Sequence, residues 1–160
     1  NGMIPIISYN YGAQKPDRMK RTMKLGVMVG CSIMVFCLAI MQVFPGQILK
    51  IFDATDEMLL MGIPAVRIMS TAFIFAGFSV TCSGMFQAVG KGVYSMIVSM
   101  ARQLFVILPV AYFLSKAMNS VNGVWAAFPI AEVFSVIIST IFLLRVYKKI
   151  VKPMESVQRD

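Results

Sequence analysis

Two charged side chains stand apart inside otherwise apolar stretches of the sequence. Arg102 follows Val93, the start of one apolar stretch, by nine residues, and Glu132 follows Val121, the start of the next, by eleven. In an α-helix, which rises 1.5 Å per residue, these offsets correspond to depths of about 14 and 16 Å from opposite ends. Both depths lie near the middle of a hydrocarbon layer about 30 Å thick. A charge placed there is costly and needs a partner inside the protein.

We expect Arg102 and Glu132 to be that partner for each other. Helices joined by a short turn pack as antiparallel neighbours, so the two side chains can form a buried ion pair or share a cavity. Two roles remain open. The pair can be an architectural salt bridge that sets helix register. Alternatively, Glu132 binds a proton or Na⁺ as a coupling ion, and Arg102 tunes that binding.

Three stripes of polar side chains accompany the pair, each on one face of an expected helix. A serine inside a membrane helix often only packs against a neighbour or bonds to a carbonyl. Three stripes together predict a shared polar pathway, with Gln87, Ser99 and Ser135 as further candidates for ion or substrate contact. The stripes are Ser79, Ser83 and Gln87; Ser95, Ser99, Arg102 and Pro109; and Glu132, Ser135 and Ser139.

Other residues that could do chemistry are few. Trp125 lies four residues into its apolar stretch, where it can anchor the helix at the interface or form part of a cage for a cationic drug. The sequence has no His, and its three cysteines form no CxxC pair. We therefore expect no catalytic residues, no metal site, no cofactor beyond a coupling ion, and no enzyme.

The elements that must position these residues are membrane-spanning helices. The chain of 160 residues is 58% hydrophobic and 14% charged. Four nearly uncharged stretches, residues 25–44, 58–88, 93–115 and 121–147, are each long enough to cross a bilayer. The predicted fold is thus an all-α integral membrane protein with four complete spans. Residues 1–12 are too short to cross and suggest the end of a fifth helix, and residues 148–160 suggest a polar tail.

The basic residues predict how these helices are oriented. Arginines and lysines concentrate between residues 15 and 24, at Lys91 and after residue 144, whereas the alternate loops hold few. The positive-inside rule therefore places these segments, and the C-terminus, in the cytoplasm of a cell membrane. Because the basic residues are placed in this way, we interpret the net charge of +8 as a signal of membrane topology and not of nucleic-acid binding.

Local signals refine the expected helices. The stretch 58–88 is too long for one perpendicular crossing and must tilt or bend, and Pro64 is the expected position of a bend. Gly26 and Gly30 form a GxxxG pair suited to close helix packing. Residues 45–52 suit a short interfacial helix, and Asp53 or Thr55 can cap the helix after it.

Several ordered motifs resemble one family of transporters. Residues 2–13, with the sequence GMIPIISYNYGA, resemble the end of the eighth helix of the multidrug and toxic compound extrusion family. The segments MFQAVGKG at 85–92, ARQ at 101–103 with Leu108-Pro109, and GVW at 123–125 with PIAE at 129–132 resemble later parts of the same family in the same order.

The resemblance implies a twelve-helix, two-lobe antiporter that exports cationic or amphipathic compounds in exchange for Na⁺ or H⁺. This chain would be part of the C-terminal lobe, and its partners would be the N-terminal lobe, the substrate and the lipid bilayer. A lipid-linked oligosaccharide flippase of the same superfamily would share the helical pattern. A small membrane subunit without enzymatic activity is the other alternative, and a membrane-embedded enzyme would need a nucleophile with a base or a metal.

Overall fold

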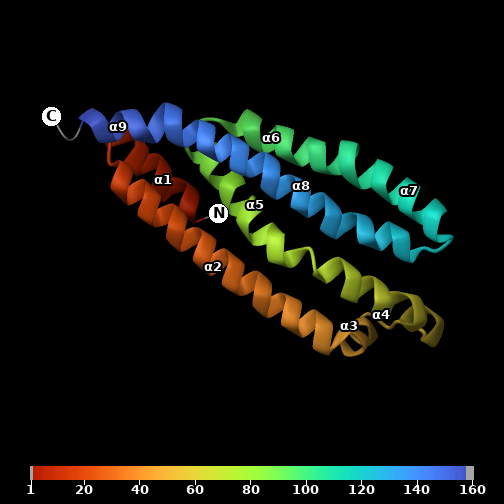
Figure 1. The fold of residues 1–160 in the computed structure, drawn as a ribbon. Coiled ribbons are helices and arrows are strands. Elements are labelled where there is room, and N and C mark those ends of the chain that lie inside the picture. Colours follow the sequence, from red (N-terminus) through yellow and green to blue (C-terminus); the bar gives the residue numbers. More distant parts are fainter. Residues whose placement is uncertain (1, 158–160) are drawn as a thin grey trace.

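The structure is a computed structural model that describes residues 2–157, and every regular element in this range is a helix. Three long helices, α2, α5 and α8, run side by side, with the α6–α7 helix along α8 (Figure 1). The elements in chain order are α1 (Met3–Gly12), α2 (Pro16–Val43), α3 (Pro45–Ile51), α4 (Asp56–Ser70), α5 (Phe73–Ala88), α6 (Gly92–Met100), η1 (Ala101–Ile107), α7 (Leu108–Met118), α8 (Asn122–Val146), η2 (Tyr147–Val151) and α9 (Lys152–Val157).

Among the described residues, three helices are long and apolar enough to cross a membrane. They are Pro16–Val43, Gly92–Met118 and Asn122–Ser156, and α4 with α5 forms a fourth span if the bent pair counts as one. Large apolar side chains such as Phe36, Phe105 and Phe113 are mostly exposed, as expected of groups that face lipid. The all-helical membrane fold expected from the sequence is confirmed.

The first spanning helix begins earlier than the sequence analysis expected. Residues 16–24, which lie before the predicted span 25–44, are also helical, because α2 already begins at Pro16. Proline is favoured at a first helical position, where its missing N–H has no helical partner in any case. The short turn between α1 and α2 contains Gln14, which has a positive φ of 55°. The basic residues of this segment therefore lie on the first turns of α2, before its apolar part begins at Leu25.

At the other end of α2, a short helix and a capped helix follow as expected. Pro45 begins α3, and the Thr55 side chain accepts a hydrogen bond from the N–H of Met58 at the start of α4. Asp56 and Glu57 lie in the first turn of α4, where negative charge is favourable.

The long stretch 58–88 is broken, but not where the sequence predicted. Pro64 lies inside α4, and the chain bends by 52° between Ser70 and Phe73. At the bend, Thr71 donates its N–H to the carbonyl of Ile68 and Ala72 donates to Met69, which is the tighter three-residue spacing. The break between the two helices therefore lies two turns after Pro64, where the hydrogen-bond pattern changes at hydroxyl-bearing residues.

The helix that carries Arg102 contains a π-helical segment, η1, that the sequence analysis did not foresee. In a π-helix each carbonyl pairs with the fifth residue on, and such segments often occur at functional positions. This register suits a segment that ends just before Pro109, which lacks an N–H. Pro109 lines neither of the cavities beside Arg102, whereas Ser95 and Ser99 line one of them.

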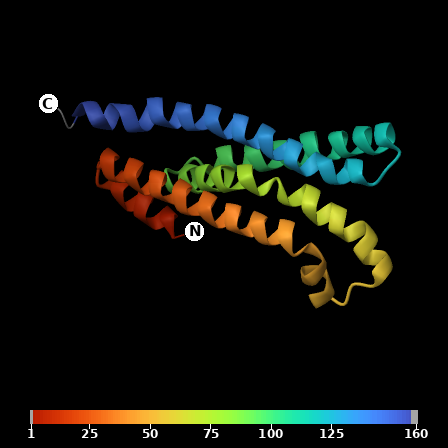
Figure 2. The ribbon, with the colours of Figure 1, turned by 60° about the horizontal axis from the view of Figure 1, so that its bottom comes forward.

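The last spanning helix continues into η2 and α9, so residues 148–157 are helical where a tail was expected. Residues 158–160 lie outside the described part of the chain. At this end of the bundle Met154 of α9 packs into a core with Ile7, Met19, Phe86 and Val146. Figure 2 shows α9 and the start of α2 at the same end of the molecule. We call it the basic end, because residues 15–24, Lys91 and residues 145–152 lie there.

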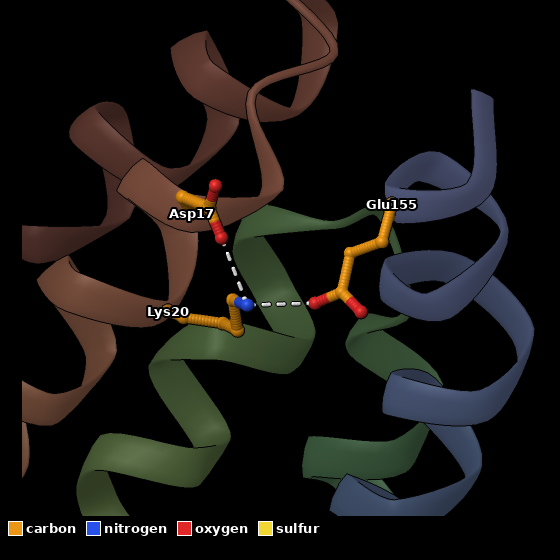
Figure 3. Close-up of polar contacts among 3 residues, drawn as sticks. All are labelled: Asp17, Lys20 and Glu155. Carbon is orange, nitrogen blue, oxygen red and sulfur yellow. Dashed lines mark ion pairs between the residues drawn. The ribbon is translucent and has the colours of Figure 1, made fainter. Parts of the chain in front are cut away.

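An ion-pair group joins α9 to α2 at the basic end. Lys20 of α2 lies between two carboxylates, with Nζ 2.7 Å from Glu155 of α9 and 2.9 Å from Asp17 (Figure 3). Hydrogen bonds to Glu155 and then to Asp17 raise the pKa of Lys20 above its usual range.

Glycines allow α2 and α5 to cross closely. A Cβ on Gly77 would lie 3.1 Å from the Cα of Cys31 and 3.2 Å from the carbonyl carbon of Gly30. A Cβ on Gly26 would overlap the Met3 side chain. The expected packing role of Gly26 and Gly30 is therefore seen directly.

Candidate functional site

Arg102 and Glu132 form an ion pair across the middle of the bundle. Arg102 lies at the start of η1 and Glu132 lies one turn after Pro129 in α8, and the distance from Arg102 Nη1 to Glu132 Oε1 is 2.5 Å. The Glu132 side chain is 10% exposed and the Arg102 side chain 33% exposed. Charge-assisted hydrogen bonds of this type are the stronger ones, and here the pair lies in a largely buried setting.

The pair leaves some of its hydrogen-bonding capacity unused. Within the described residues, Glu132 Oε2 and Arg102 Nε are buried and have no hydrogen-bond partner. The nearby hydroxyls of Ser135 and Ser139 on α8 are buried in the same way. Buried polar atoms normally find partners, so such a cluster is typical of a site that accepts water, an ion or a ligand.

On the basic side of the ion pair lies a cavity of about 470 Å³ with many polar groups, which we call the inner cavity. Its walls come from α1, α2, α5, α6, η1 and α8. The three polar stripes expected from the sequence meet here. Their members in the wall are Ser79, Ser83, Gln87, Ser95, Ser99, Arg102 and Ser135.

On the opposite side lies a second cavity of about 360 Å³, which we call the outer cavity. It is mainly apolar and is bounded by the end of α2, the α4–α5 bend, η1 and α8. Methionine and phenylalanine side chains form much of its wall, and flexible methionines can adapt to ligands of varied shape. The lining includes Met41, Met69, Phe73, Ile107 and Phe128, with Gln103, Arg102 and Glu132.

Arg102 connects the two cavities, because it lines both of them. Glu132 lines only the outer cavity, although its α8 neighbour one turn on, Ser135, lines the inner one. The polar inner cavity and the mainly apolar outer cavity thus meet at the Arg102–Glu132 ion pair. This arrangement resembles the midplane sites of transporters, where polar groups in broken or irregular helices face a closed-off space.

The candidate residues from the sequence fall into two groups. Arg102, Ser99, Ser135 and Gln87 lie together at the inner cavity, and Gln87 donates from Nε2 to the hydroxyl of Ser95 at 3.2 Å. Glu132 joins them through Arg102. Trp125 lines neither cavity and is partly buried near the far end of α8, so the structure separates it from the other candidates.

Sequence reasoning missed two contributors. Thr81, which lines the inner cavity, donates its hydroxyl to the carbonyl of Gly77, and a hydroxyl that bonds within its own helix carries no special sequence signal. The second is the α4–α5 bend, where Ser70 and Phe73 line the outer cavity. Ser70-Thr71 in the sequence is a signal that could have located it. Over residues 2–157 no group of three or more His, Cys, Asp or Glu side chains could hold a metal ion.

Fold and site together define a class: a helical, multi-pass membrane protein with the architecture of a transporter. Residues 1–113 match the model of the MatE family, which is well over half of the chain. The chain belongs to the multidrug and toxic compound extrusion (MATE) family, as its motifs suggested.

Curated relatives and solved structures agree with this membership. The multidrug export protein MepA of Staphylococcus haemolyticus is 26% identical over 125 residues, covering 78% of this chain and 27% of the relative. The probable multidrug resistance protein YoeA of Bacillus subtilis is 26% identical over 139 residues, or 86% of this chain and 30% of the relative.

Among solved structures, the MATE multidrug transporter DinF-BH is 32% identical, with a TM-score of 0.81 over 93% of this chain and 33% of that chain. An inward-facing MATE family transporter of the MOP superfamily has a TM-score of 0.84 at 18% identity, over 96% of this chain and 35% of that chain. The chain therefore spans about a third or less of the length of these proteins.

Proposed function

We propose that the chain belongs to a secondary active antiporter that exports cationic or amphipathic drugs in exchange for Na⁺ or H⁺. In this proposal the chain supplies part of one lobe, the C-terminal one, and a second lobe completes the substrate pathway. The observation that carries the proposal is the Arg102–Glu132 pair, which lies where a polar and an apolar cavity meet. The relatives named for multidrug export support the substrate class.

The outer cavity suits the apolar part of an amphipathic substrate. Drug-sized ligands bind in spaces of about 300 to 1,000 Å³ that are mostly apolar and contain a few placed polar groups. The outer cavity, at about 360 Å³, has methionine and aromatic walls with Arg102 and Glu132 at one edge. Compounds whose apolar parts differ in shape can bind against such a wall, since methionine side chains repack easily.

The inner cavity suits the coupling ion. Serine hydroxyls and the Gln87 side chain offer oxygen atoms, which can accept hydrogen bonds from a hydrated proton or coordinate Na⁺. Glu132, which lies on the outer side of Arg102, is the carboxylate that the cation would neutralise once it passes the ion pair, and Arg102 would then be released from its partner. Binding an ion and binding a substrate are thereby linked through one side chain pair, which is what exchange requires.

The orientation in the membrane is part of this proposal. The basic end would face the cytoplasm, as the positive-inside rule predicts from residues 15–24, Lys91 and the C-terminal lysines. The inner cavity would then lie on the cytoplasmic side of the ion pair and the outer cavity on the external side.

Transport by the complete protein tests the proposal. The full reading frame that contains this chain would be reconstituted in vesicles loaded with tetraphenylphosphonium, and a Na⁺ or H⁺ gradient would be imposed in turn. We expect one gradient to accelerate export and the other to have little effect. Movement of a lipid-linked oligosaccharide, or no response of export to either gradient, would contradict the proposal.

A further inference from the structure

We propose that Gln42 is a positioning residue that fixes the bend between α4 and α5 and, through it, the wall of the outer cavity. Gln42 is on α2, two residues before that helix ends in the C-cap Phe44. It is not among the residues that line the outer cavity, so it would act from outside the site.

The carbonyl of Arg67 lacks its usual helical donor. Inside a regular helix this oxygen would accept the N–H of Thr71, four residues on. In the structure the N–H of Thr71 donates instead to Ile68. The Arg67 oxygen accepts from Gln42 Nε2 at 2.8 Å and from the hydroxyl of Ser70 at 3.1 Å.

The hydrogen bond from Gln42 to the Arg67 carbonyl favours the bent arrangement of α4 and α5 over a straight helix. An unpaired carbonyl is costly in hydrocarbon, so a bend there needs a substitute donor. The Ser70 hydroxyl supplies one such donor from within α4, and Gln42 supplies a second, at the shorter distance, from a neighbouring helix. The Gln42 amide also donates to Ser70 Oγ at 3.1 Å. If α4 and α5 were one straight helix, the N–H of Thr71 would also donate to the Arg67 carbonyl, so the hydrogen bond from Gln42 would add less to the straight form than to the bent one.

The bend forms part of the wall of the outer cavity. Met69, Ser70, Ala72 and Phe73 all lie at or beside the bend and line the outer cavity opposite Glu132. A straighter helix would move these side chains away from their present places. The effect on the bend does not depend on the proposed function, whereas any effect on export rests on it.

The test replaces Gln42 with methionine, which has a similar length and shape but no donor. Spin labels would be attached at two exposed positions, Leu60→Cys on α4 and Phe113→Cys on α7. The distance between the labels in the complete protein reports the direction of α4. The native Cys31, Cys37 and Cys82 would be replaced by alanine, so that they do not take up label. A rotation of α4 by about 20° would displace residue 60, about 16 Å from the bend, by about 5 Å. We expect Gln42→Met to shift or broaden the distance distribution by about that amount.

Two further variants separate a donor effect from a packing effect. Gln42→His keeps an N–H donor and should restore most of the native distribution. Gln47→Met makes the same replacement at an exposed glutamine of α3 and should leave it unchanged. An unchanged distribution in Gln42→Met, or a shift of equal size in Gln42→His, would overturn the inference.

Export gives a second, separate measurement. If the outer cavity binds substrate, Gln42→Met should raise the tetraphenylphosphonium concentration for half-maximal export by about threefold to tenfold, the range expected from one hydrogen bond, with a smaller change in maximal rate. Adding Ser70→Ala to Gln42→Met should cost more than Ser70→Ala alone, since it removes the last side-chain donor to the Arg67 carbonyl. If the complete wild-type protein does not export, the proposed function fails, but the spin-label distances still decide the role of Gln42.

Discussion

Arg102 and Glu132 are thirty positions apart in the sequence, and their side chains meet with Nη1 2.5 Å from Oε1. This contact joins a π-helical segment to the proline-containing helix α8. Each residue alone would be a largely buried charge without an opposite charge beside it, so each depends on the other.

The first prediction is that the two residues are energetically coupled. Removing one partner leaves a buried charge, so Glu132→Gln or Arg102→Gln alone should destabilise the protein by up to about 3 kcal/mol. The double variant should be less damaged than the two single losses added together. Thermal stability of the purified complete protein, with membrane abundance, measures the cycle, and additive losses would show that the contact contributes no stability.

The second prediction concerns the crossing of α2 and α5. Gly77→Ala places a methyl group within 3.1 Å of the backbone of Cys31, which the two helices can accommodate only by moving apart. A cost of about 1 to 3 kcal/mol is expected for such overpacking. Gly92→Ala is the matched control, because a Cβ there meets no atom within 4 Å. Equal melting temperatures for the two variants would refute the close crossing.

The third prediction concerns the link between α9 and α2. Lys20→Met removes both ion pairs of Lys20 and should speed hydrogen exchange in α9, whereas Lys24→Met, at an exposed lysine one turn on, should not. Because the pKa of Lys20 is raised, its stabilising contribution is present below the ordinary lysine pKa and is lost only as pH rises through the higher value.

Exchange in α9 should therefore show no Lys20-dependent change between about pH 6 and about pH 9, but it should increase at high salt, which screens exposed pairs. Identical α9 exchange in Lys20→Met and wild type would mean that the apolar contacts of Met154 and Val151 suffice.

The fourth prediction is that the basic end faces the cytoplasm. The structure decides which position can be labelled: Met19 is fully buried, whereas Arg21 on the same segment is exposed. In intact cells, a cysteine at Arg21 should resist an impermeant reagent, and one at the exposed Lys50 should react. Reaction at Arg21 and protection at Lys50 would reverse the orientation.

Much of the fold could be predicted because membrane helices leave a strong signal. Length and apolarity located the spans, and the depths of Arg102 and Glu132 from opposite ends predicted their contact. The spacing of polar residues also predicted that Ser99, Ser135 and Gln87 share a pathway, and all three line the inner cavity. These features depend only on helix geometry and on the high cost of burying charge.

The rest depends on contacts between helices, which a single sequence does not reveal. Pro64 was the stronger local signal for a bend, yet the bend lies at Ser70–Phe73, where Gln42 from another helix supplies a donor. The π-helical segment around Arg102 has no composition of its own. Likewise, residues 148–157 are polar enough to suggest a tail, but Val151 and Met154 pack into an apolar core with residues of α1, α2 and α5.

The most direct test of the central claim is ion-driven export by the complete protein with Glu132→Gln, compared with wild type at equal membrane abundance. Glutamine keeps the size of the side chain but removes the charge that would bind the coupling ion. The account predicts that export no longer responds to the ion gradient, while tetraphenylphosphonium still binds. Normal gradient-driven export by a well-expressed Glu132→Gln would contradict it and leave the Arg102–Glu132 pair an architectural contact.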